Sequence, residues 1–183
     1  IKPLIAANPH VEFIGEINDA RKPDFLSGAH APDAGEIELD GRPYRPADPH
    51  DARLKGVAMI YQELNLALHL PAWENITLGA ESARAGWIDR RAGRERARAA
   101  LAQLGHGELD LDRPAGAFGI AEQQVIEIAR ALLNRPRVLI LDEPTSSLTQ
   151  ADTARLFEVI NRLRAQGVSI IYISHFLEEC RSI

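Results

Sequence analysis

The sequence predicts an α/β fold organised around a parallel sheet. Residues 138–141 form a continuous apolar run and residues 168–173 a nearly continuous one, which is typical of strands buried on both faces. Residues 150–163 have apolar side chains at helical spacing, and a strand, a helix and a strand in this order form a parallel crossover unit. Asp142 and Glu143 follow the first run, at the edge where open α/β sheets bind ligands. For an isolated Leu-Asp-Glu-Pro segment, an acidic turn after a strand would be the commoner interpretation.

The composition is that of a globular protein. The chain has 183 residues, 45% of them hydrophobic and 26% charged, enough for one domain or for a core plus a small subdomain. Its net charge of -5 argues against a general nucleic-acid binder. No apolar run is long enough to cross a bilayer and no signal peptide opens the chain, so we expect an intracellular location. The single cysteine, Cys180, excludes an internal disulfide framework, and the start at Ile1 without methionine suggests a fragment.

The N-terminal part lacks a phosphate-binding loop. Residues 11–14 predict a short strand that ends at Gly15, where a nucleotide-binding protein has the pattern G-x-x-x-x-G-K-[ST]. No second glycine precedes Lys22, and Pro23 stands where Ser or Thr should hold magnesium. Because the residue before a proline avoids helical geometry, Pro23 also argues against a helix that begins at Lys22. Gly15 and Lys22 are therefore the only remnants of a phosphate site in this stretch.

The next part predicts a small β portion near residues 35–60. Residues 36–43 alternate polar and apolar side chains before a turn, which indicates a hairpin. Residues 56–61 form another buried strand, which ends at Gln62. A glutamine in this place can hydrogen-bond a metal-bound water and the backbone, although taken alone it would more often be a loop residue.

Two helices are predicted between residues 89 and 133. One runs from Asp89, a plausible cap, to Leu104, and its many arginines most simply form a solvated face. Nucleic-acid binding is a weak alternative, because the basic side chains lack interleaved aromatic residues. The other begins near Ala121, with a wide apolar stripe over residues 125–133 that indicates packing against a core.

The last predicted unit joins a second set of polar residues to the same sheet edge. Thr149 and Asp152 resemble a capping box at the start of the crossover helix, and Gly167 ends it. The strand over 168–173 leads to His175. Because parallel strands end at one edge of a sheet, we expect Glu143 and His175 to lie there together.

Five motifs, in this order, resemble those of the nucleotide-binding cassette of ABC transporters: a Q-loop at 61–63, a signature at 121–124, a Walker B strand at 139–144, a D-loop at 146–149 and a switch histidine at 173–175. The amino-acid sequences of residues 59–66, 73–79 and 174–179 are similar to those of the first of two tandem cassettes in monosaccharide importers of the ribose, xylose and galactose type. The resemblance, from about Gly28 to the end, implies a P-loop NTPase cassette fold. One partial domain would cover 1–183, with a parallel core sheet, a small β portion and a helical signature subdomain at 80–133.

The resemblance also implies roles for single residues. Asp142 and Gln62 would hold Mg²⁺, and Glu143 would polarise the attacking water as general base. Gln62 would sense the γ-phosphate and relay to the membrane subunit, while His175 would contact that phosphate. The signature segment would contact ATP held by a second cassette through the positive N-terminus of its helix: Gly119, Ala121, Glu122 and Gln123.

The implied function is that of the ATP-binding subunit of a sugar importer, an ATP hydrolase with ATP and Mg²⁺ as cofactors. Its partners would be transmembrane permease subunits, a second cassette and, indirectly, a periplasmic sugar-binding protein, but not nucleic acid. It would lie at the cytoplasmic face of the inner membrane as a peripheral subunit. An ABC ATPase of DNA repair or translation is a third possibility. The similarity of residues 59–79 to sugar-importer sequences argues against it.

Three departures favour an alternative, a non-hydrolysing cassette with a docking role. The phosphate loop is missing between Gly15 and Leu26, and Phe118-Gly119 stands where Leu-Ser is usual. The N-terminal strands with their adenine-stacking aromatic residue would also have to fit before Gly15. Without amides around the phosphates, Glu143 has little correctly placed substrate to act upon. We therefore predict that this chain alone binds ATP weakly or not at all.

Overall fold

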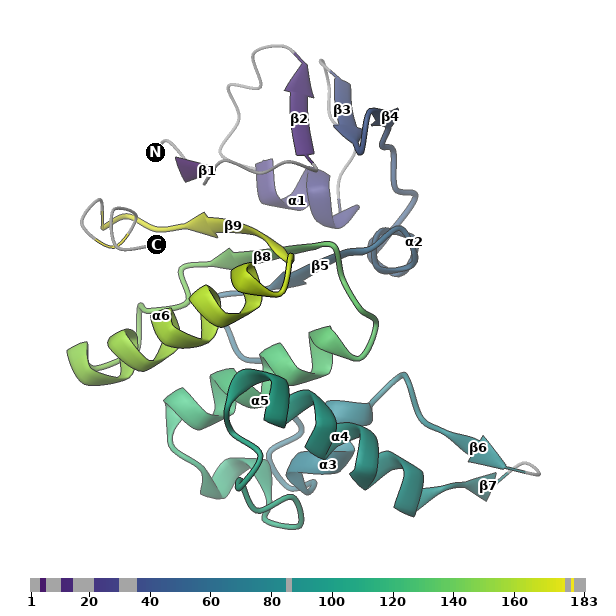
Figure 1. Ribbon diagram of the computed structural model, residues 1–183, viewed down its shortest axis with the longest axis vertical. Helices are drawn as coiled ribbons and strands as arrows, with labels where there is room; N and C mark the ends of the chain where they lie inside the picture. The colour runs from purple at the N-terminus through teal and green to yellow at the C-terminus, as the bar shows by residue number, and fades with distance from the viewer. Residues whose placement is uncertain are drawn as a thin grey trace.

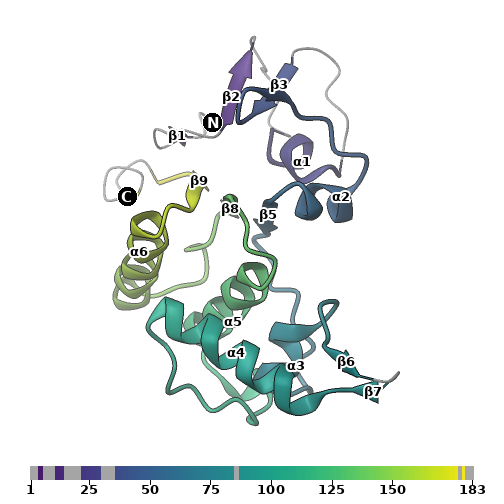
Figure 2. The same ribbon diagram turned by 45° about the vertical axis from the view of Figure 1, so that its right-hand side comes forward.

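The computed structural model describes residues 4–5, 11–14, 22–29, 36–84, 87–176 and 179. Figure 1 shows three parts along the long axis: a small antiparallel sheet at the top, a central sheet in the middle and a group of helices at the bottom. Figure 2, turned by 45°, shows the same succession of parts. Their connections explain how residues that are distant in the sequence reach one sheet edge.

The central sheet has four strands, in the order β1 (Leu4–Ile5), β9 (Ser169–Ile173), β8 (Val138–Asp142) and β5 (Val57–Ile60). β5, β8 and β9 are parallel, whereas β1 pairs antiparallel with the outer edge of β9. α6 (Gln150–Ala165) connects β8 to β9, which confirms the predicted parallel crossover. Its predicted cap is also confirmed, since the Thr149 hydroxyl accepts from the backbone N–H of Asp152 at 3.2 Å.

β8 is buried on both faces, as its uninterrupted apolar sequence predicts. Leu139 and Leu141 pack into the larger hydrophobic core, between the sheet and the helices. Val138 and Ile140 point the other way, into a smaller core beneath α1 (Lys22–Ser27) and the antiparallel sheet. Both faces of β8 thus have apolar partners, which accounts for its uninterrupted apolar sequence up to Leu141.

The small β portion differs from its prediction in extent. β2 (Val11–Ile14), β3 (Glu36–Leu39) and β4 (Arg42–Pro43) form a separate antiparallel sheet, and the predicted hairpin is confirmed. Asp40 and Gly41 form its turn with φ of 53° and 69°, the geometry that Asp-Gly favours. β5 belongs to the central sheet, so the prediction that this portion reaches residue 60 is wrong. β2 is likewise absent from the parallel sheet, where a phosphate loop would have to follow it.

The prediction that Pro23 prevents a helix from beginning at Lys22 is wrong. α1 starts at Lys22, with the proline in its first turn. Proline is tolerated there because the first N–H groups of a helix have no partner within it. The same rule explains α2 (Pro49–Leu54), which the sequence did not predict and which Asp48 caps by accepting from the N–H of Asp51 at 2.8 Å.

The helical part consists of α3 (Ala72–Thr77), α4 (Arg90–Leu104), a short 3₁₀ helix (Ala115–Ala117) and α5 (Ile120–Leu132). A hairpin of β6 (Ala83–Arg84) and β7 (Trp87–Ile88) projects from it (Figure 1). Asp89 caps α4 as predicted, by accepting from the N–H of Ala92 at 3.0 Å. Within the described parts of the chain, no helix combines the length and the apolar character needed to span a bilayer.

Candidate functional site

The turn after β8 places Glu143 over the end of the parallel sheet. Asp142 still pairs with Ile173 of β9, and the N–H of Glu143 donates to the carbonyl of Ile173 at 2.9 Å. Glu143 then adopts φ of 46°, in the left-handed region. This conformation costs a non-glycine residue about 1 kcal/mol or more. The strain is tolerated because the ladder on one side and Pro144 on the other determine the path of the chain.

Glu143 and His175 lie together at this edge, as predicted. His175 Nε2 is 3.2 Å from Glu143 Oε1. Glu143 is 8% exposed, whereas the His175 side chain is 60% exposed. Burial raises the pKa of Glu143, while the charge of a protonated His175 opposes that rise. A buried carboxylate thus faces a solvent-accessible imidazole, and the contact is a hydrogen bond when the imidazole proton is on Nε2.

Gln62 follows β5, on the opposite side of β8 from β9 and His175, and Asp142 is the last residue of β8 itself. Ile60 pairs with Leu141, so Gln62 follows β5 at the level where Glu143 follows β8, and its side chain is exposed. Among the described residues, no three His, Cys, Asp or Glu side chains form a metal-binding group. Mg²⁺ is usually held by one or two protein ligands, with phosphates and water supplying the rest. Asp142 with the amide oxygen of Gln62 fits such a minimal set.

A hydrogen-bond cluster that the sequence did not predict supports this edge. Glu179 Oε2 accepts from three hydroxyl groups: Thr145 Oγ1 at 2.9 Å, Tyr172 OH at 2.9 Å and Ser174 Oγ at 2.8 Å. Thr145 follows Glu143 in the turn, and Ser174 precedes His175. One carboxylate therefore connects the two loops that carry the pair. The sequence offered no periodicity for it, because one donor lies in β9, one directly after β9 and one in the turn after β8.

The predicted signature segment forms the N-terminus of α5, but its polar groups contact one another. The N–H of Gly119 donates to Glu122 Oε2 at 3.0 Å, which closes the first turn. Gln123 is buried, and its Nε2 donates to the carbonyl of Phe118 at 2.9 Å. Gly119 and Glu122 are exposed and Ala121 is partly buried. The surface offered to another molecule at this helix start is thus backbone, the carboxylate of Glu122 and the exposed apolar side chain of Ile120.

The two predicted phosphate contacts in the N-terminal part, Gly15 and Lys22, stay predictions. Gly15 lies outside the described residues. Lys22 is described only as the first residue of α1.

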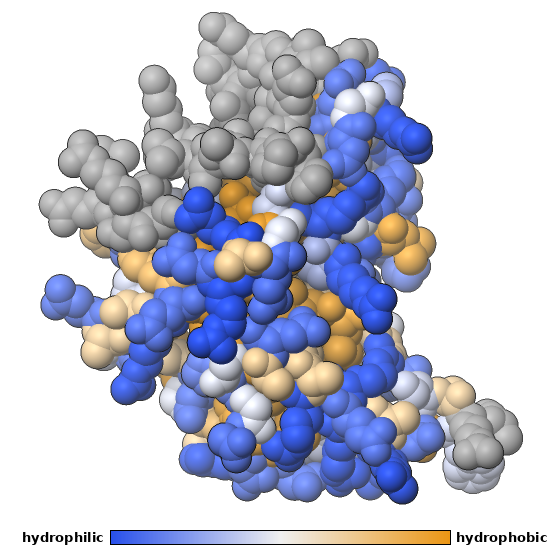
Figure 3. Space-filling view, in the orientation of Figure 1, coloured by the Kyte–Doolittle hydropathy of each residue, from blue (hydrophilic) through white to orange (hydrophobic). Residues whose placement is uncertain are grey.

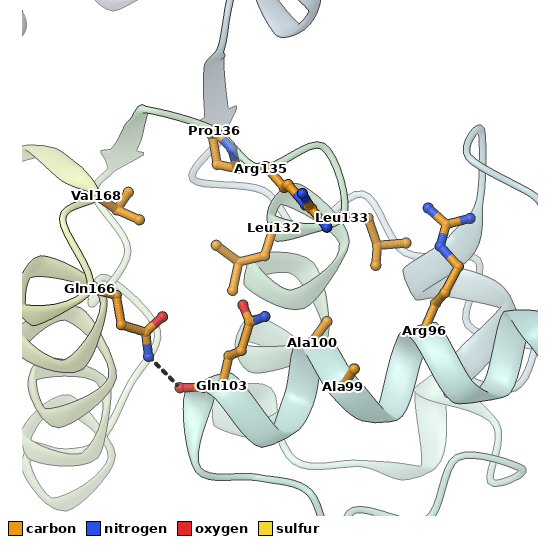
Figure 4. Close-up of a pocket in the computed structure, with 10 residues that line it drawn as sticks. All are labelled: Arg96, Ala99, Ala100, Gln103, Leu132, Leu133, Arg135, Pro136, Gln166 and Val168. Atoms are coloured by element: carbon orange, nitrogen blue, oxygen red, sulfur yellow. Dashed lines mark hydrogen bonds between the residues drawn. The ribbon is translucent and has the colours of Figure 1, made fainter.

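Two cavities lie away from the polar edge. One, of about 310 Å³, separates α4 from the ends of α5 and α6 (Figure 4), and Gln166 Nε2 donates across it to the carbonyl of Gln103 at 3.2 Å. The other is a groove of about 560 Å³ between β5, α2 and α5. Neither is lined by Asp142, Glu143 or His175.

Comparison with known proteins agrees with this architecture. A family model described as ABC transporter matches residues 24–146, more than half of the chain. The Ribose import ATP-binding protein RbsA of Chromobacterium violaceum is 49% identical over 155 residues, which cover 85% of this chain and 31% of that protein. Ribose import ATP-binding protein RbsA 1 of Rubrobacter xylanophilus is 44% identical over 183 residues, 98% of this chain and 36% of that one. The chain thus spans about a third of the length of these relatives.

A solved ATP-binding cassette of an ABC transporter, in its ADP conformation, superposes with a TM-score of 0.75 at 22% identity, over 88% of this chain and 67% of the other. The likeness shows the fold, a P-loop NTPase cassette with its parallel core sheet. The matched family model includes the β8 strand with Asp142 and Glu143. The chain therefore belongs to the ABC transporter family.

Proposed function

We propose that this chain is part of the ATP-binding subunit of a carbohydrate importer. The observation that carries the proposal is the pairing of Glu143 with His175 beyond two parallel strands, beside Asp142. The assignment to carbohydrate import rests on the names of the two relatives, which describe ribose import. Permease subunits, and a peripheral position at the cytoplasmic face of the inner membrane, follow from the same assignment.

In this proposal the polar edge prepares and orients a water molecule. Mg-ATP, when bound, supplies the phosphoryl group and its metal ion, which Asp142 and Gln62 would hold. Glu143 accepts the proton of the water, and the burial that raises its pKa makes its carboxylate a better base at neutral pH. His175 is exposed enough to turn from Glu143 towards a terminal phosphate. The hydrogen bonds of Glu179 hold the two loops in a fixed relative position while His175 turns from Glu143 to the phosphate.

Two further surfaces suit protein partners. The exposed N-terminus of α5 would face a nucleotide bound to a second cassette, with the carboxylate of Glu122 partly neutralising the positive helix end. The groove between β5, α2 and α5 would accept a permease segment, and Leu54 and Leu78 line it with exposed fractions of 76% and 47%. In Figure 3, apolar surface is visible in the middle of this face, between the upper and lower parts of the molecule. A periplasmic sugar-binding protein would act only through the permease.

The test is nucleotide binding by the chain as it is and by a version with a glycine-rich loop, lysine and Ser/Thr restored before α1. We expect calorimetry to show weak or no binding of Mg-ATP by the chain as it is, and clear binding after repair. Submicromolar binding without repair would contradict the importance of the missing loop. A folded, repaired chain with unchanged affinity would favour the alternative, a non-hydrolysing cassette that docks on its partners.

A further inference from the structure

A buried carboxylate in the middle of α5 grips a backbone segment distant in sequence. Glu127 is 4% exposed and lies among the apolar residues that attach α5 to the core. Its Oε1 accepts from the N–H of Asn65 at 3.0 Å and from Arg130 Nη2 at 2.5 Å. Arg130 Nη1 in turn donates to the carbonyl of Asn65 at 2.8 Å. Two side chains of one helix thus form a closed ring with both backbone polar groups of a single residue.

This ring, which we call the Asn65 clamp (Asn65, Glu127 and Arg130), does not use the Asn65 side chain. Any residue with a backbone N–H can therefore occupy position 65, whereas proline cannot. A second device holds the next part of the loop. Asn75 of α3 accepts from the N–H of Ala67 at 2.8 Å and donates to its carbonyl at 3.0 Å. The loop after Gln62 is thus fixed to the helical part from two sides.

The Asn65 clamp is close in sequence to the polar edge, because Asn65 follows Gln62 by three residues. Ile60 is held in the central sheet by its pairing with Leu141, and Asn65 is held by α5. Gln62 lies between these two anchors, in a stretch that is mostly exposed. Only two residues, Glu63 and Leu64, separate Gln62 from the anchor on α5, so a shift of α5 relative to the sheet pulls on the stretch that carries Gln62.

Stability alone does not account for the clamp. Burial raises the pKa of Glu127 against the opposing effects of Asn65 and Arg130, so ionising it inside the protein is unfavourable. Its second oxygen, Oε2, is buried and has no hydrogen-bond partner within the described structure. Apolar residues usually stabilise such a position as well as a buried ion pair does. What the pair adds is a defined geometry between a helix and a loop.

We propose that Glu127 and Arg130 are positioning residues that make Gln62 move with the signature helix α5. The proposal rests on the proposed function, because α5 and Gln62 matter together only if both face a nucleotide. Displacement of α5 by a second cassette would then be transmitted to Gln62 by hydrogen bonds rather than by loose packing.

The experiment measures the coupling without nucleotide, in the full chain with Cys180→Ser. Spin labels at Gln62→Cys and Ile120→Cys report the distance between the loop and the start of α5. We expect a narrow distance distribution in the parent and a broad one after Asn65→Pro or Glu127→Ala. The matched control Asn65→Ala keeps the backbone N–H and should leave the distribution narrow. Distributions that stay narrow in folded Asn65→Pro and Glu127→Ala proteins would overturn the proposal.

Amide exchange provides a second readout if one variant does not fold. We expect the amide of residue 65 to exchange about 10- to 100-fold faster after Glu127→Ala, since a charge-assisted hydrogen bond is lost. Amides of β8 should exchange at the parent rate. Equal protection at residue 65 would contradict the clamp. If the repaired chain binds no Mg-ATP but the distances broaden as expected, the coupling stands and the proposed function fails.

Discussion

The polar edge of the sheet and the N-terminus of α5, both predicted to contact ATP, use their polar groups in different ways. At the edge, Glu143 faces His175 across 3.2 Å with one partner buried and the other exposed. At the helix, Glu122 and Gln123 are bound to the backbone of Gly119 and Phe118. The edge therefore keeps groups ready for a reacting molecule, whereas the helix uses its side chains to hold its own first turn. The two regions should respond differently to the same chemical change.

The largest difference is expected in hydrolysis. In the loop-repaired chain, Glu143→Gln should lower the ATP hydrolysis rate by about 10²- to 10⁴-fold, because an amide cannot accept the proton. Glu122→Gln, the matched change in the helix, should leave the rate within a few-fold. Steady-state phosphate release measures both rates. Equal losses in the two variants would show that the regions do not differ in this way.

The next largest effect concerns the support of the edge. Glu179→Ala removes the acceptor of three hydroxyl groups and should lower the free energy of unfolding by about 1–3 kcal/mol. Glu179→Gln keeps an oxygen acceptor and should retain part of this stability. Urea denaturation of the chain as it is measures both. No loss in the alanine variant would mean that solvent replaces the carboxylate without cost.

In the helix, Gln123→Ala should lower the free energy of unfolding by about 1 kcal/mol, because the carbonyl of Phe118 loses its donor. Gln123→Glu is the companion variant, since a carboxylate cannot donate to that carbonyl when ionised. We expect urea denaturation to show it no more stable than Gln123→Ala at neutral pH. If Gln123→Ala leaves the free energy of unfolding unchanged, the amide serves to bind a ligand rather than to stabilise the fold.

Glu122→Ala should have the smallest stability effect in the helix, about 0.5–1 kcal/mol, since it removes one exposed cap. The thermal midpoint and urea denaturation both measure it. If the stability instead increases, repulsion rather than capping governs this carboxylate.

The pH dependence of stability tests the polar edge through the direction of the change in the free energy of unfolding, not through its magnitude. Burial raises the pKa of Glu143 above its ordinary value of 4.5, so the folded protein holds the proton more tightly than the unfolded chain. The stability that this group contributes is present below pH 4.5 and is lost as the pH rises through the folded pKa. Glu143→Gln should therefore be more stable than the parent at neutral pH, and the advantage should vanish in acid. An advantage that grows in acid would contradict the raised pKa.

Several elements could be predicted because their causes are local. The apolar run of residues 138–141 predicts β8, and the capping side chains of Asp89 and Thr149 predict the starts of α4 and α6. Parallel strand order then places Glu143 and His175 at one edge, which the structure confirms. The start of α1 at Lys22 could have been predicted from the tolerance of proline in a first turn.

By itself, the sequence determined the crossover unit, the caps and the residues at the strand ends, because periodicity and capping depend on neighbours in the chain. Only the tertiary structure decided that β2 joins an antiparallel sheet, that Glu179 collects three hydroxyl groups and that Glu127 and Arg130 hold Asn65. These contacts join groups with no shared period, and a buried carboxylate does not reveal its partner until the chain has folded around it.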